Sequence, residues 1–156
     1  MNKEITTLSA HMEKVLYGEP WFGRSVFSVL EETDENNVHL KPGGREHSLC
    51  ELLWHMITWA EFTLKRVGKV AAPDPAALEK LDWRPIDPGF HTWKKGVTEL
   101  KSIHTQLVAL LREKEDSFLD EKVDNRSYDF RFLLNGLTEH TIYHLGQIAY
   151  LQKLLR

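Results

Sequence analysis

The sequence predicts an all-α protein, folded as a four-helix bundle with one long crossover. Apolar residues recur at spacings of three and four along the long stretches of the chain. Four of the six prolines fall within residues 69–89, between the two middle stretches. No two stretches alternate apolar and polar residues as paired strands do. Helices without a sheet bury their apolar stripes against one another, and this favours a bundle.

The first expected helix covers residues 3–16 and is weakly amphipathic. Its stripe consists of Ile5, Leu8, Met12, Val15 and Leu16. Gly18 and Pro20 interrupt it, and a second piece is expected in "EPWFGRSVFSVLEE", where Pro20 suits a first-turn position. The stretch "TDENNVHLKPGG" has the composition of a loop.

Signals at both ends of "HSLCELLWHMITWAEFTLKRVGK" predict the next helix. Ser48 is the expected N-cap, and Glu51 three residues later completes a capping box. Gly68 suits the C-cap, after Lys65 and Arg66, which complement the negative end of the helix dipole. Apolar residues cover most of the circumference between these limits, so we expect this helix to pack on several sides, within a bundle or against another subunit.

Residues 69–89 are expected to form an irregular crossover, pinned in part by Trp83. Loops of this length are uncommon in compact domains unless they cover a site or join parallel helices. The pattern then predicts a helix over 90–114, a short extended piece in "SFLDEKVDNRSYDF" and a last helix over 129–155.

Composition limits the classes of function. A chain of 156 residues suits a single domain, 1–156. The formal net charge of −3, without any block of like charges, gives no footprint for nucleic acid or anionic lipid. One cysteine, Cys50, rules out an internal disulfide, and the polar N-terminus resembles no signal peptide. No segment is apolar enough for a membrane span, so a cytoplasmic protein is expected.

The stretch "LTEHTIYHLGQIAY" carries the main clue to function. His140 and His144 lie four residues apart, on the helix face that also carries Leu137 and Ile148, and Gln147 falls close to the same line. A buried imidazole without partners costs on the order of 1–3 kcal/mol. Two imidazoles on a buried face therefore need donors, acceptors or a cation.

A divalent metal is the economical partner, because imidazoles at i and i+4 reach one ion together. A third ligand must then come from another helix. His55 is the best candidate because its neighbours are apolar, and Glu51 is a possible carboxylate ligand or outer-shell residue although its capping role already explains it. His39 and His47 belong to the loop, His91 begins a helix, and His11 and His104 have polar neighbours.

An alternative remains open at this point: His140 and His144 could be core residues that bond carbonyls or hydroxyls. Cys50 is expected to be a buried packing residue rather than a ligand. The tryptophans are expected to be core or loop anchors, with Trp54 or Trp59 as candidates for lining a pocket.

Two segments, "HSLCELLWHMITWAEF" and "LNGLTEHTIYHLGQIAYLQKLLR", resemble the DinB-like (YfiT-type) superfamily, and "WFGRSVFSVLEET" is similar to its first-helix region. The resemblance spans nearly the whole chain, and "EHTIYHLGQI" is its most distinctive part. It implies His55, His140 and His144 as metal ligands, and Gln147 matches a glutamine common in the family. It also implies up-down-down-up topology, with the long crossover between the second and third helices of the bundle.

The resemblance implies a metal-dependent enzyme acting on a small molecule, either a hydrolase or a thiol S-transferase of the bacillithiol type. An ion held by three imidazoles lowers the pKa of bound water, or holds a thiol as thiolate. Zinc and nickel are the expected metals, and iron and copper also suit imidazole. Glu51, Glu61 and Glu139 lie near the motifs, but none is assigned as general base.

The alternative is a non-catalytic stress-related or ligand-binding bundle, in which the metal is structural or lost. An open coordination position beside a cavity would separate the two. Several members of the family are homodimers, so a homodimer is also an expectation.

Overall fold

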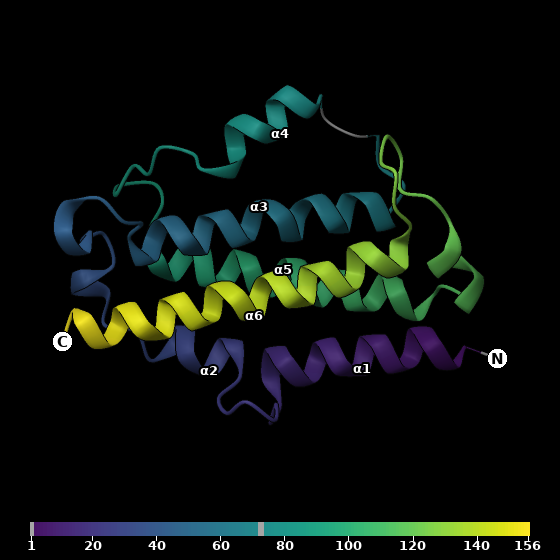
Figure 1. Ribbon diagram of the computed structural model, residues 1–156, viewed down its shortest axis with the longest axis horizontal. Coiled ribbons are helices and arrows are strands. Elements are labelled where there is room, and N and C mark those ends of the chain that lie inside the picture. Colours follow the sequence, from purple (N-terminus) through teal and green to yellow (C-terminus); the bar gives the residue numbers. More distant parts are fainter. Residues whose placement is uncertain (1, 72–73) are drawn as a thin grey trace.

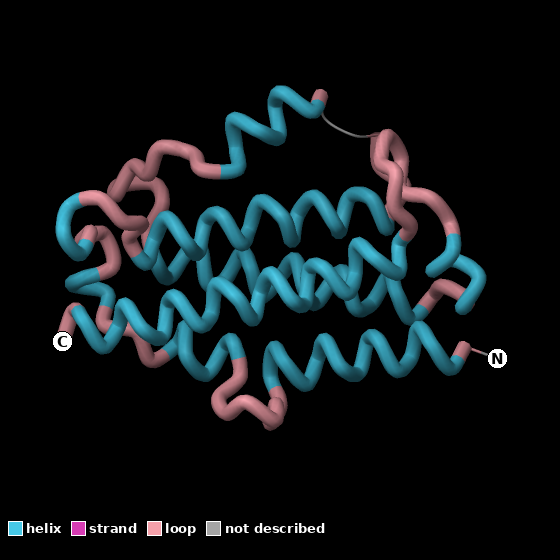
Figure 2. Tube along the Cα trace, viewed as in Figure 1, coloured by secondary structure: helices cyan, strands magenta, loops and turns pink. Residues whose placement is uncertain are grey.

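The computed structural model describes residues 2–71 and 74–156, and these residues are helical throughout their regular structure (Figures 1 and 2). The α-helices are α1 (Lys3–Tyr17), α2 (Val26–Glu31), α3 (Leu49–Val67), α4 (Pro75–Asp82), α5 (Trp93–Arg112) and α6 (Phe130–Leu154). Three 3₁₀ turns, Glu35–Asn37, Pro42–Gly44 and Asp116–Asp120, lie in the connections. The only β-pairing among the described residues is an isolated bridge between Lys122 and Asp129. The prediction of an all-α protein is confirmed.

The four long helices α1, α3, α5 and α6 lie side by side. In Figure 1, α3 and α5 run in one direction and α1 and α6 in the other. The chain returns from the end of α3 to the start of α5 along the outer side of α3, and α4 lies on this return path. Among the described residues, no helix combines the length and hydropathy that a membrane span requires.

The best-defined helix is α3, as its end signals predicted. Ser48 accepts a hydrogen bond from the amide of Glu51, and the Glu51 carboxylate accepts one from the amide of Ser48. Most of the helix is buried because it packs between α5 on one side and α6 on the other. Its approach to α5 is close at Gly96, where a Cβ would lie 2.7 Å from a methyl carbon of Leu53.

Several boundaries differ from the prediction. The second helix begins at Val26 instead of Pro20, because Ser25 is the residue with N-cap geometry and residues 21–24 form turns. The third long helix is shorter than 90–114, since Thr92 caps it at Trp93 and it ends at Arg112. The expected extended piece contains the 3₁₀ turn Asp116–Asp120 followed by the isolated bridge.

The crossover over 69–89 contains a helix, α4, although its four prolines led us to expect an irregular segment. Asp74 caps α4 by accepting a hydrogen bond from the amide of Ala76, and Pro75 occupies the first helical position. Proline is tolerated there because its missing N–H would have no partner within the helix. Residues 72 and 73 of this crossover lie outside the described part of the chain.

Candidate metal centre

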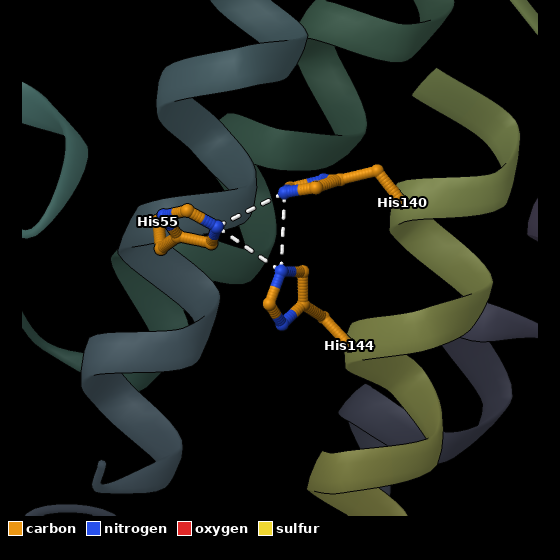
Figure 3. A group of neighbouring side chains, drawn as sticks. All are labelled: His55, His140 and His144. Atoms are coloured by element: carbon orange, nitrogen blue, oxygen red, sulfur yellow. Dashed lines mark hydrogen bonds between the residues drawn. The ribbon is translucent and has the colours of Figure 1, made fainter. Parts of the chain in front are cut away.

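Three histidine side chains meet between α3 and α6 (Figure 3). The Nε2 atom of His55 lies 2.9 Å from Nε2 of His140 and 3.0 Å from Nε2 of His144. The Nε2 atoms of His140 and His144 are 3.1 Å apart. The spacing of four residues places the last two rings on one face of α6, and α3 presents His55 to them from the opposite side.

The cluster is shielded from solvent. His55 is 6% exposed and His144 5% exposed, while His140 is partly buried. Aromatic side chains surround it: the ring of Trp83 lies 3.8 Å from that of His55 and nearly parallel to it, and Trp59 meets His140 edge-on. Bulk solvent therefore has little access to the ring nitrogens of His55 and His144.

The Nδ1 atoms of two rings have acceptors. His55 Nδ1 lies 2.8 Å from the Asp82 carboxylate and 3.1 Å from the Asp82 carbonyl. His144 Nδ1 lies 2.6 Å from Oε1 of Gln147. Carboxylates and carbonyls accept hydrogen bonds, so both Nδ1 atoms carry the ring proton and both Nε2 atoms are bare lone pairs. His140 Nδ1 is buried and has no partner within the described residues.

All three rings are neutral near pH 7. Burial lowers the pKa of His55, although Asp82 opposes the shift. Burial likewise lowers the pKa of His144, with Gln147 opposing. For His140, burial and then the two neighbouring rings lower the pKa to about 3. Neutral imidazole is the form that binds metal ions.

Protons alone cannot satisfy this arrangement. A neutral His140 brings one proton, which either points at one of two bare Nε2 atoms or remains on Nδ1 and leaves three lone pairs facing one another. A cation at the centre would give every Nε2 atom a partner. Nitrogen atoms 2.9–3.1 Å apart lie about 1.7 Å from the centre of their triangle, so an ion about 2.0–2.1 Å from each nitrogen, as in zinc sites, fits on one side of that plane. The buried cluster could therefore hold a metal ion.

Asp82 and Trp83 were not predicted as parts of the site. Both belong to the end of α4, which lies over α3, and Asp82 also accepts a hydrogen bond of 2.7 Å from Nε1 of Trp59. Trp83 was expected only to pin the crossover, and it does so by stacking between His47 and His55. Asp74 and Pro75 signal the start of this helix, but no local pattern in the sequence places its end beside His55.

Gln147, which matches a glutamine common in the family, and Glu51, the outer-shell candidate from the sequence, lie in different places. Gln147 is in direct contact with His144. Glu51 makes its contacts at the start of α3, with Ser48, with Lys41 at 2.7 Å and with His47. Among the other candidates, Glu61 pairs with Lys65 at 2.7 Å.

Cys50 is fully buried, and burial raises the pKa of its thiol to about 11. It is a packing residue, as predicted, and its sulfur contacts the carbonyl of His91 at 3.0 Å. His104 was expected among polar neighbours but is 1% exposed, because the face of α5 that carries it turns into the core. Its partner is the carbonyl of Leu100, not the cluster.

A hollow of about 290 Å³ adjoins the cluster through Gln147. It lies at the end of the α3–α6 interface, with mostly apolar walls: Pro42, Glu46, His47, Leu52, Gln147, Tyr150, Leu151 and Leu154. Leu52 precedes His55 by three residues and Leu151 follows His144 by seven, so the hollow continues the seam that contains the histidines.

A model of the DinB superfamily matches residues 23–148, which include all three histidines, Asp82 and Gln147. No curated protein matches the chain. The match includes "HSLCELLWHMITWAEF" and "EHTIYHLGQI" in full, and most of the other two segments that carry the resemblance seen in the sequence.

Proposed function

Because the chain belongs to the DinB superfamily, we propose that it is a divalent-metal-dependent enzyme that acts on a small molecule at His55, His140 and His144. The observation that carries this proposal is the group of Nε2 atoms at 2.9–3.1 Å, with fewer protons than lone pairs. Three protein ligands suit a catalytic ion, since structural zinc sites normally have four. The up-down-down-up topology implied by the resemblance is part of the proposal and agrees with the helix directions in Figure 1.

The proposed reaction is hydrolysis or thiol S-transfer, with zinc or nickel as the metal. A bound divalent ion supplies a Lewis acid that activates water or a thiol near neutral pH. The protein's own residues supply orientation and shielding: Asp82 and Gln147 fix two of the rings, and Trp59 and Trp83 limit water around them. The apolar hollow beside Gln147 offers room for part of a small substrate.

Elemental analysis of the purified protein tests the metal site. We expect about one divalent ion per chain in the wild type, and loss of most of it in His144→Ala, because two imidazoles hold an ion poorly. His11→Ala is the matched control, since His11 is an exposed histidine on α1. Equal metal content in the wild type and His144→Ala would remove the basis of the proposal.

Cobalt substitution separates an enzyme from the non-catalytic alternative. An open coordination position lets an added thiol bind the ion, and this changes the cobalt absorption spectrum. If the absorption spectrum of the cobalt-loaded protein changes neither with added thiol nor with pH, the result would indicate a structural ion. The homodimer stays a prediction, which sedimentation analysis would test.

A further inference from the structure

The segment Leu81–Arg84, here called the clasp, connects the crossover to the histidine cluster. The carbonyl of Leu81 lies 2.9 Å from Oγ1 of Thr58 on α3, and Arg84 donates a hydrogen bond of 2.7 Å to the same hydroxyl. Trp83 stacks on His47 and His55, with ring centroids 3.7 and 3.8 Å away. The clasp is thus attached to α3 directly beside a proposed metal ligand.

Asp82 is the residue of the clasp that engages the cluster through hydrogen bonds. Its carboxylate and its carbonyl both lie within hydrogen-bond distance of His55 Nδ1, at 2.8 and 3.1 Å. The carboxylate oxygen that contacts His55 also accepts from Trp59 Nε1 at 2.7 Å. Because Trp59 lies one turn after His55 on α3, the two contacts fix the carboxylate across one turn of that helix.

These contacts determine which nitrogen of His55 faces the cluster. A proton held on Nδ1 leaves Nε2 as a lone pair, which is the form a metal needs. Stacking of Trp83 on the ring face opposes rotation of the ring out of this orientation. A carboxylate bonded to the far nitrogen of a histidine ligand also raises its basicity, and loss of such a partner commonly weakens metal binding about 10–100-fold.

We propose that Asp82 is a positioning residue of the metal centre, which holds His55 ready for the ion and couples metal binding to the seating of the clasp on α3. The proposal rests on the proposed function, because it assigns Asp82 a role toward the same ion. Its consequence is that the connection between α3 and α5 is a working part of the site. Metal binding and attachment of the clasp then strengthen each other.

The test measures zinc affinity by competition with a chelator in the wild type, Asp82→Ala and Asp82→Asn. We expect Asp82→Ala to bind zinc at least about tenfold more weakly than the wild type does. Asp82→Asn should lose less, because its amide oxygen still accepts from Nδ1. Glu79→Gln is the matched control, as it removes one negative charge from an exposed position of the same helix. Trp59→Phe removes the second donor to Asp82 and should weaken binding less than Asp82→Ala does.

Two further measurements separate positioning from general destabilisation. The absorption bands of the cobalt-loaded protein should shift in Asp82→Ala, whose helix content is checked by circular dichroism. Zinc should slow hydrogen exchange of the clasp amides in the wild type and fail to do so in Asp82→Ala. Wild-type zinc affinity and an unchanged cobalt spectrum in both Asp82 variants would overturn the inference and leave the proposed function intact. A wild type that binds no metal would overturn both.

Discussion

Two buried histidine environments in this protein differ in how the rings are satisfied. His104 on α5 is 1% exposed and has a single partner, the carbonyl of Leu100, 3.0 Å from its Nδ1. Its other neighbours include Met12, Val15 and Leu16, with no room for water between them. His55, His140 and His144 are instead shielded together, with their Nε2 atoms facing one another.

The difference shows that burial by itself does not indicate a functional histidine. A lone neutral ring places its proton on the nitrogen that faces a carbonyl, as His104 does one turn back along its own helix. In the cluster, His55 and His144 donate hydrogen bonds from Nδ1 to partners outside the triangle, so lone pairs outnumber protons inside it. The balance of protons and acceptors distinguishes the two environments.

Added zinc should produce the largest difference between the two histidine environments, because only the cluster can bind it. Zinc at about a thousand times its dissociation constant should stabilise the wild type by about 4 kcal/mol, because the ion binds only the folded chain. His55→Ala should lose this gain together with most of the bound metal. Urea unfolding with zinc and with excess chelator measures the difference. If zinc stabilises His55→Ala as strongly as the wild type, the third ligand is another residue.

Lowering the pH should destabilise the protein through protonation of His104 in the unfolded chain. Burial lowers the pKa of His104 to about 4, whereas the unfolded chain has a value near 6.5, so only the unfolded state takes up this proton between those limits. Stability therefore falls as the pH decreases from about 6.5 to about 4, and this group accounts for about 3 kcal/mol of the fall. His104→Leu should flatten the dependence by that amount.

The measurement is urea unfolding of both proteins across this pH range in excess chelator. Without metal, the cluster histidines titrate alike in the two proteins, and the difference between the curves isolates His104. Parallel curves would mean that His104 is protonated as easily in the folded protein as in the unfolded chain.

The sequence predicted the parts of the fold that local signals specify. The capping box of Ser48 and Glu51 marked the start of α3, and the spacing of His140 and His144 placed both rings on one face. The start of α4 was missed because Pro75 was counted as a breaker, although Asp-Pro is also a helix start. The buried position of His104 was missed because Ser102, Thr105 and Gln106 beside it in the sequence are polar, while Leu100, Leu107 and Val108, three or four positions away, set the buried face.

The candidate site was predictable to the same extent. His55 was chosen because its own helix offered it no polar surroundings, and the structure brings it to the other two rings. Asp82 could not be found in this way, because it follows His55 by 27 residues through a connection whose path depends on tertiary packing. Helix periodicity relates residues one or two turns apart, and says nothing of contacts across such a connection.

The smallest expected effect concerns the hydrogen-bond acceptors of His104 and His144. Leu100 offers His104 a backbone carbonyl, which substitution does not remove, whereas Gln147 offers His144 a side chain. Gln147→Ala should weaken zinc binding by roughly tenfold, or about 1.4 kcal/mol, since the ring loses the acceptor that keeps its proton on Nδ1. Gln147→Glu retains an acceptor there and should bind zinc at least as tightly as the wild type. Gln106→Ala, at an exposed position on α5, is the control. Equal affinities in Gln147→Ala and the wild type would show that His144 keeps its orientation without this partner, and the explanation would then have to lie in the packing of α6 against α3.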